Sequence, residues 1–240
     1  MFVIADPLTT TDPEVGGAVA SGDRRWLEVR ARALAAAGAD AIDLNASSLG
    51  SAEADVLLWM AEVVEAVTDL PLSLDGPDPA ALLRCARGRR APVVLNSWPA
   101  DAVFDETLVD VLQRPGSRLV VQLRRGRTLP AGAEDRRAWA EDAVERFAGA
   151  GLDPQSLLID AIALPWGTDV AAGRELLEFV AAWAHDHPEI PTLVGLGNVG
   201  HGAADPAEAR RTWLELLAAA GLGAVLLDPR DRTLAPFRAG

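Results

Sequence analysis

The sequence predicts a (β/α)8 barrel that forms one domain over residues 1–240, and two patterns support this fold class. Eight short apolar runs recur along the chain, and amphipathic stretches with helical spacing separate them. The apolar runs are nearly continuous, which is typical of parallel strands that are buried on both faces. A doubly wound parallel sheet is the alternative, because it uses the same alternation of strands and helices.

Several predicted helices are bounded by residues that suit their ends. Asp205 and Pro206 form an N-cap and first-turn pair, and Gly38, Gly151 and Gly221 are placed to end helices. The predicted strands cover residues 2–6, 41–45, 72–76, 93–97, 118–123, 157–162, 192–198 and 224–228. The predicted helices cover roughly residues 23–38, 53–67, 78–88, 101–113, 134–149, 171–186 and 206–220.

The segment after the last predicted strand is short. It reads PRDRTLAPFRAG, which is too short for a full closing helix of the barrel. The sequence therefore predicts a barrel with a shortened or missing last helix. Such a barrel is either partly open at this point or covered there by a partner subunit.

Composition and charge limit the class of protein. A chain of 240 residues that is 50% hydrophobic can bury a large core. Its net charge of −13 disfavours nucleic acid or an anionic membrane surface as the main partner. No run reaches the roughly 18 uncharged apolar residues of a membrane span, and the N-terminus lacks a basic signal region. With one cysteine, Cys85, and three histidines, we expect a soluble cytoplasmic protein without a disulfide or metal site.

The chain contains no lysine, so all 22 basic residues are arginines. Schiff-base chemistry, lysine general bases and pyridoxal phosphate enzymes are thereby excluded. Asparagine is also scarce, with Asn45, Asn96 and Asn198 as its three occurrences. Because the chain keeps so few asparagines, their positions carry more weight than usual.

Polar residues collect at the carboxyl ends of the predicted strands, where parallel barrels carry their functional sites. One aspartate or asparagine there can simply cap the next helix. All three asparagines lie at such ends, however, and several aspartates join them, which favours a shared site. The candidate residues are Asp43, Asn45, Asp75, Asn96, Asp160 and Asn198.

These side chains suit a flat ring with both donors and acceptors on one edge. A carboxylate accepts two parallel N–H bonds, and a carboxamide donates and accepts at once. A 2-amino-4-oxo heterocycle presents the matching pattern, and a pterin and a guanine share it. The residues alone leave both ligands open.

A glycine string near the end of the chain offers a competing interpretation. Gly195, Gly197 and Gly200 match the G-x-G-x-x-G pattern of dinucleotide-binding loops. That pattern should open the first strand–helix unit, with an acidic residue about 20 positions later. Here it lies far down the chain without such a residue, so Asn198, in the middle of the string, is the stronger candidate.

Several segments together resemble the pterin-binding barrels, which comprise dihydropteroate synthase and the methyltetrahydrofolate–corrinoid methyltransferases. The similar segments are GADAIDLNASS, LPLSLDG, VVLNS, LLIDAIALP and VGLGNVGHG, spread over nearly the whole chain. The resemblance implies that Asp75, Asn96 and Asp160 hold the pterin edge. Asp43 and Asn45 are further candidates for binding it.

The segment after the seventh strand separates the two branches of this family. Dihydropteroate synthases carry a Ser-Arg-Lys motif there, which a chain without lysine lacks. GLGNVG (195–200) is instead similar to the Gly-Leu-Ser-Asn-Val-Ser of the methyltransferases. This implies transfer of the N5-methyl group of methyltetrahydrofolate to the cobalt of a corrinoid protein. Asn198 would donate a hydrogen bond to N5, and Asp75 and Asp160 would orient the ring and help relay a proton.

The same resemblance implies partners for the chain. No D-x-H-x-x-G cobalamin signal is present, so the corrinoid (cobalamin) is expected on a separate protein, and the chain is expected to be a homodimer. Three alternatives remain open: a catalytically silent folate-binding subunit, a dihydropteroate synthase-like enzyme, and a metal-dependent hydrolase or lyase. The altered first strand end, Asp6-Pro7-Leu8, and the short C-terminus favour the silent subunit.

Two further groups are weaker candidates. Arg124, Arg125 and Arg127 follow the fifth strand, where they could hold a folate glutamate tail, contact an acidic partner, or form a solvated loop. Trp98 and Trp166 follow the fourth and sixth strands, where each could stack on the pterin or simply pack.

Overall fold

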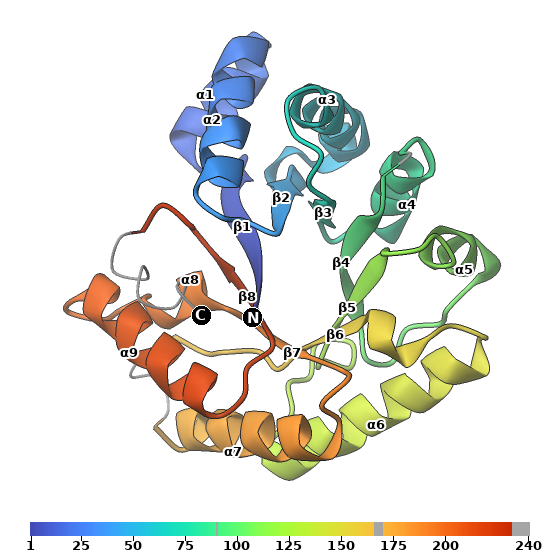
Figure 1. The fold of residues 1–240 in the computed structure, drawn as a ribbon, viewed down its shortest axis with the longest axis vertical. Helices are drawn as coiled ribbons and strands as arrows, with labels where there is room; N and C mark the ends of the chain where they lie inside the picture. The colour runs from blue at the N-terminus through green and yellow to red at the C-terminus, as the bar shows by residue number, and fades with distance from the viewer. Residues whose placement is uncertain (90, 166–169, 232–240) are drawn as a thin grey trace.

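Eight parallel strands close into a barrel in the computed structural model, which describes residues 1–89, 91–165 and 170–231 (Figure 1). Strand β8 pairs with β1, with Phe2 opposite Ala224, so the sheet has no open edge. This closure confirms the (β/α)8 barrel and excludes the doubly wound sheet. The strands are β1 (Phe2–Thr9), β2 (Ala41–Asn45), β3 (Leu72–Asp75), β4 (Val93–Pro99), β5 (Arg118–Gln122), β6 (Leu157–Asp160), β7 (Thr192–Gly195) and β8 (Ala224–Leu227).

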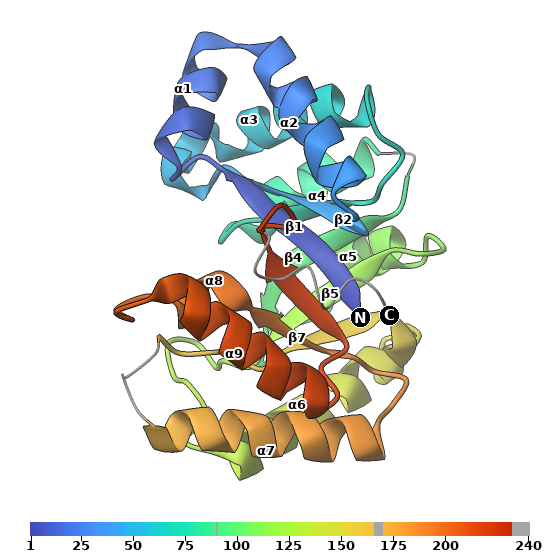
Figure 2. The ribbon, with the colours of Figure 1, turned by 60° about the vertical axis from the view of Figure 1, so that its left-hand side comes forward.

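Helices surround the barrel, as Figures 1 and 2 show. Most begin at an aspartate that caps the first turn, and Asp205 does so by accepting hydrogen bonds from two backbone N–H groups. The helices are α1 (Pro13–Ser21), α2 (Arg24–Ala36), α3 (Glu53–Glu65), α4 (Pro79–Arg87), α5 (Glu106–Leu112), α6 (Ala133–Gly149), α7 (Val170–Asp186), α8 (Leu196–Val199) and α9 (Pro206–Ala219), with 3-10 turns η1 (Ser47–Ala52) and η2 (Pro154–Ser156).

The apolar core has two layers. The larger layer lies between the strands and the surrounding helices and includes the buried Trp183, Phe147 and Phe179. A smaller cluster fills the interior of the barrel with one residue from each of seven strands. Asn96 and Asp160 lie two residues beyond cluster members on their strands, toward the carboxyl ends. The cluster consists of Ile4, Ala41, Val94, Val120, Leu158, Leu193 and Ala224.

Some element boundaries differ from those that the sequence predicts. β1 continues to Thr9, with an irregular register between Ala5 and Leu8 around Pro7, which has no N–H to donate. A helix, α1, follows β1 and was not predicted, although Asp12 and Pro13 carry the same signal as Asp205 and Pro206. The predicted strand 192–198 ends at Gly195, and the next four residues form α8.

The structure describes only part of the segment for which a shortened or missing last helix is predicted. Pairing of β8 with β1 shows that the strands leave no gap at this point of the barrel. Most of the segment that the prediction concerns, residues 232–240, lies outside the described residues.

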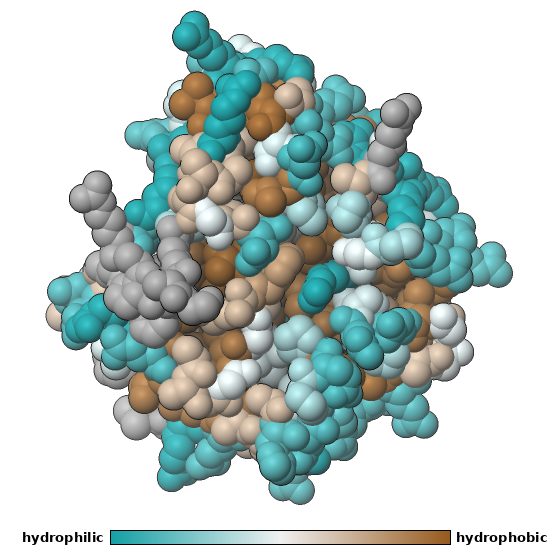
Figure 3. Space-filling model, viewed as in Figure 1, coloured by the Kyte–Doolittle hydropathy of each residue, from teal (hydrophilic) through white to brown (hydrophobic). Residues whose placement is uncertain are grey.

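None of the described helices combines the length and the apolar character that crossing a membrane requires. Charged and polar residues cover much of the periphery in Figure 3, and apolar residues show mainly between them.

Candidate functional site

Strand register brings polar residues together at the carboxyl end of the barrel. Asn45 pairs with Asp75 across β2 and β3, Asp75 pairs with Asn96, and Gln122 pairs with Asp160 across β5 and β6. They border a cavity of about 280 Å3. All six residues predicted from the sequence lie in its wall. The lining residues are Asp6, Thr9, Asp43, Asn45, Asp75, Asn96, Ser97, Gln122, Asp160, Gly195, Gly197, Asn198 and Leu226.

Asp43 lines this cavity and is 2% exposed. Its Oδ1 accepts hydrogen bonds from Ser73 Oγ at 2.5 Å and from Asn96 Nδ2 at 3.3 Å. Burial, and next the charge of Asp75, raise the pKa of Asp43 well above its usual range. Asp43 thus anchors the Asn96 amide, whose carbonyl oxygen makes no hydrogen bond to another described residue.

Asp75 is held by its neighbour on β2. Asn45 Nδ2 donates to Asp75 Oδ2 at 2.7 Å, and Asn45 Oδ1 accepts from both the backbone N–H and the hydroxyl of Ser47. Burial raises the pKa of Asp75 to about 6; the hydrogen bond from Asn45 opposes this shift, and the charges of Asp160 and Glu53 add to it. Asp75 is therefore a carboxyl group that exchanges its proton near neutral pH.

Asp160 has one partner on each carboxylate oxygen. Ile162 N donates to Oδ1 at 2.9 Å, just past the end of β6, and Ile162 itself has a positive φ of 55°. Gln122 Nε2 donates to Oδ2 at 3.3 Å. Burial raises the pKa of Asp160, and these two hydrogen bonds oppose the rise. Each oxygen keeps acceptor capacity, so Asp160 can receive two parallel N–H groups from a ligand.

Asn198 enters the cavity from a helix instead of a strand. The prediction that a strand carries it is wrong, because β7 ends at Gly195 and Asn198 lies in α8. Its Nδ2 packs against Gly195, 3.4 Å from the position that a Cβ there would take. Asn198 is exposed, and its side-chain amide makes no hydrogen bond to another described residue. The amide is therefore free to donate to a bound molecule.

The sequence interpretation missed several lining residues, of which Asp6 and Gln122 have the clearest chemistry. Burial, and next the charge of Asp228, raise the pKa of Asp6 to about 6. Asp6 Oδ2 also lies near Gly197, next to Asn198. Both residues follow the rule that selected the other candidates, a polar side chain near the carboxyl end of a strand, and that rule could have found them.

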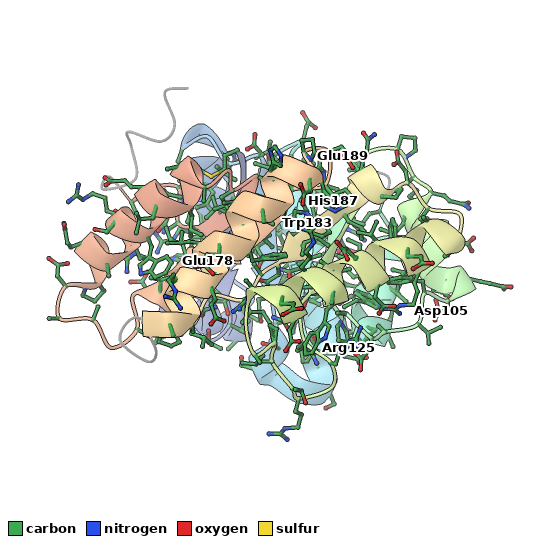
Figure 4. The ribbon with its side chains drawn as sticks, turned by 90° about the horizontal axis from the view of Figure 1, so that it is seen from below. Asp105, Arg125, Glu178, Trp183, His187 and Glu189 are labelled. Carbon is green, nitrogen blue, oxygen red and sulfur yellow. The ribbon has the colours of Figure 1, made fainter. Side chains whose placement is uncertain are left out.

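Most of the weaker candidates have other roles. Trp98 is 4% exposed and belongs to the apolar core, so it packs and does not wall the cavity. Arg125 turns toward α6, where it pairs with Asp142 at 2.9 Å and covers the Trp139 ring (Figure 4). Trp166 lies outside the described residues.

Three further observations concern histidine, thiol and metal chemistry. His187, just after α7, stacks on Trp183 with a centroid distance of 4.1 Å and lines no part of the cavity (Figure 4). Cys85 is buried in the core. In the part of the chain that the structure describes, no three His, Cys, Asp or Glu residues are arranged to hold a metal ion.

Comparison with known proteins identifies the family. The sequence profile of the pterin-binding enzymes matches residues 17–224, which is more than half of the chain. The chain belongs to this family. This pterin-binding enzyme is 24% identical over 236 residues to the methylcorrinoid:tetrahydrofolate methyltransferase of Eubacterium limosum, covering 98% of the chain and 87% of that protein.

Solved structures of dihydropteroate synthases share the fold of this pterin-binding enzyme. The enzyme from Stenotrophomonas maltophilia superposes with a TM-score of 0.70 at 19% identity, covering 99% of this chain and 92% of that one. The enzyme from Thermus thermophilus gives a TM-score of 0.65 at 23% identity, covering 100% and 92% of the two chains. At this level of identity, the likeness shows a common fold.

Proposed function

We propose that this pterin-binding enzyme transfers the N5-methyl group between methyltetrahydrofolate and the cobalt of a corrinoid protein. The observation that carries the proposal is the unpaired amide of Asn198, which lines a cavity whose other walls present carboxylates and amides. The name of the Eubacterium limosum relative describes this chemistry for that protein, and the absence of lysine sets the chain apart from the Ser-Arg-Lys motif of the other branch.

In this proposal the carboxylates recognise the pterin ring. Asp160 accepts N3–H and the 2-amino group, because it lines the cavity and each of its oxygens has spare acceptor capacity. Asn96 presents its free carbonyl oxygen, while Asp43 holds the other end of its amide. Asp75, supported by Asn45, accepts a further N–H. The ring is thereby held in one orientation before the reaction.

The transfer step requires help at N5, which is a poor leaving group. The C–N5 bond breaks and leaves its electron pair on N5, while Co(I) supplies the pair that forms the bond to the methyl carbon. A hydrogen bond from Asn198 Nδ2 stabilises the developing charge on N5, and a proton from solvent neutralises it. Asp75, with a pKa of about 6, is suited to carry that proton. The reverse reaction uses the same groups.

The proposal extends to the partners of the enzyme. The corrinoid is bound by a partner protein that docks over the open side of the cavity, where Asn198 is exposed. The family resemblance adds the expectation of a homodimer in the cytoplasm.

Methyl transfer to free Co(I) cobalamin tests this function, with methyltetrahydrofolate binding followed separately by calorimetry. We expect Asn198→Ala to bind methyltetrahydrofolate within a few-fold of wild type and to lose about 10²- to 10³-fold in transfer rate, as when other transition-state donors are removed. His201→Ala is the matched control, since His201 is exposed and close to Asn198 in the chain.

The outcomes separate the competing functions. Binding without transfer in the wild-type protein would favour a silent binding subunit. Binding of no reduced folate or pterin would overturn the proposal. An equal transfer rate in Asn198→Ala and wild type would remove Asn198 from the mechanism.

A further inference from the structure

Gln122 is held in one amide orientation by Arg124. Arg124 Nε donates to Gln122 Oε1 at 2.6 Å, and Arg124 Nη1 donates to the carbonyl oxygen of Gly126 at 2.8 Å. A guanidinium group only donates hydrogen bonds, so the side-chain oxygen of Gln122 has to face it. The Gln122 amino group consequently faces Asp160, to which it donates at 3.3 Å.

The backbone places these three side chains in a row. Gln122 ends β5 and is paired with Asp160 at the end of β6. The chain then turns tightly, with Arg124 N donating to Gln122 O at 2.7 Å, and Leu123 between them is fully buried. Leu123 belongs to the core, and the hydrogen bond from Arg124 Nε to Gln122 Oε1 shows that the two side chains that flank it meet.

The orientation of this amide decides what the cavity offers to a ligand. The Gln122 amino group has two N–H bonds, and Asp160 takes one of them. Gln122 lines the cavity, so the second N–H is a donor placed beside the two acceptors of Asp160. If the amide flipped, the cavity would offer a carbonyl oxygen at this place.

We propose that Arg124 is a positioning residue that makes Gln122 a specificity determinant, so that the cavity selects a 2-amino-4-oxo ring over its 2,4-diamino analogue. The inference rests on the proposed function and deepens it. The edge of a 2-amino-4-oxo ring reads acceptor, donor, donor, acceptor from O4 to N1. The two donors, N3–H and the 2-amino group, meet Asp160, and O4, the acceptor next to N3–H, meets the Gln122 donor.

The diamino analogue fails at this edge for a physical reason. Its position 4 carries a donor and its N3 is an acceptor, so the fixed donor of Gln122 faces a donor and one oxygen of Asp160 faces an acceptor, while the other oxygen still meets the 2-amino group. A freely rotating Gln122 could flip and accept from a 4-amino group, but Arg124 opposes that flip. An unpaired or opposed buried polar group costs more than the original bond contributes.

The neighbouring arginines provide a contrast. Arg125 is engaged with Asp142 and Trp139 on α6. Arg127 is exposed on the same loop and lines no part of the cavity. Of these three basic residues, Arg124 is the one whose side chain contacts a cavity-lining side chain.

The test compares 6-methylpterin with 2,4-diamino-6-methylpteridine, which differ at position 4 and lack a glutamate tail. Dissociation constants are measured at pH 7 for wild type, Arg124→Met, Arg124→Lys and Gln122→Glu, with Arg127→Met as the matched control. Circular dichroism checks that each variant is folded. Met keeps the apolar stem of Arg124 and removes its donors, whereas Lys keeps a donor.

We expect wild type and Arg127→Met to prefer 6-methylpterin strongly. Arg124→Met should reduce that preference about tenfold, the effect of about one hydrogen bond, and Arg124→Lys should restore part of it. Gln122→Glu keeps a partner for Arg124 but loses the donor, so its preference should fall at least as far.

Other results overturn the proposal. An unchanged preference in folded Arg124→Met and Gln122→Glu would overturn the inference alone, because pterin binding itself would remain. Loss of affinity for both ligands in equal proportion would assign Arg124 a merely structural role. A wild-type protein that binds neither ligand would overturn the proposed function together with this inference.

Discussion

Asn45 on β2 and Asp75 on β3 are joined by a hydrogen bond of 2.7 Å from Asn45 Nδ2 to Asp75 Oδ2. The two residues are direct partners in the strand register, and Ser47 fixes the orientation of the Asn45 amide by donating to its oxygen. This bond stabilises the ionised form of a carboxyl group that burial would otherwise keep protonated. The pair therefore sets the pH at which the cavity gains this acceptor.

Pterin binding should depend on pH through Asp75. The pKa of Asp75 lies at about 6, so its acceptor is lost, and binding weakens, as pH falls through 6. Asn45→Ala removes the interaction that lowers this pKa, and the midpoint of the binding profile should move to higher pH. Calorimetric titrations between pH 5 and 8 measure the midpoint. A profile that is the same in wild type and variant would contradict this account.

Asp160→Asn should abolish tight pterin binding. The carboxylate accepts two N–H groups in the proposed complex, and an amide in its place presents a donor to one of them. Two charge-assisted hydrogen bonds correspond to about 10²-fold or more in affinity. Asp101→Asn, an exposed position outside the cavity, serves as the control. Equal affinities for Asp160→Asn and wild type would place the ligand elsewhere.

Asp6→Asn should stabilise the fold at neutral pH. Burial raises the pKa of Asp6 from 3.8 to about 6, so between these values the folded state binds more protons than the unfolded state. The free energy of unfolding therefore falls as pH rises from about 4 to 6, by on the order of 2 kcal/mol from this group. The asparagine of the Asp6→Asn variant does not titrate, so the free energy of unfolding does not fall in this way. Urea unfolding should show a gain at pH 7 and little difference at pH 4.

Gly76→Ala should destabilise the barrel. A Cβ at Gly76 would overlap the carboxylate of Glu53, which is 4% exposed and has one oxygen without a hydrogen-bond partner among the described residues. Overpacking of this kind costs about 1–3 kcal/mol. Gly17→Ala is the control, because this exposed helical glycine has open space and alanine favours helix. Chemical denaturation measures both variants; a neutral Gly76→Ala would mean that Glu53 moves aside readily.

The sequence predicted cavity-lining residues wherever the pattern of apolar and polar residues near a position was enough to place it at a strand end. Asp43, Asn45, Asp75, Asn96 and Asp160 lie near the carboxyl ends of apolar runs, and the rule that barrel sites gather at strand ends was enough to find them. The same rule failed for Asn198 in one respect. The strand ends at Gly195 and the next four residues are helical, so a short helix carries the residue that strand periodicity assigned to β7.

The sequence by itself determined the alternation of strands and helices, the buried runs and the set of polar strand ends, because these follow from the spacing of apolar and polar residues. Only the tertiary structure decided that β8 pairs with β1, that Gln122 lies opposite Asp160, and that Arg124 rather than Arg125 contacts a side chain of the cavity wall. Those facts depend on register between strands far apart in the chain. Hydrogen bonds between strands and packing of the whole core fix that register, which no local pattern encodes.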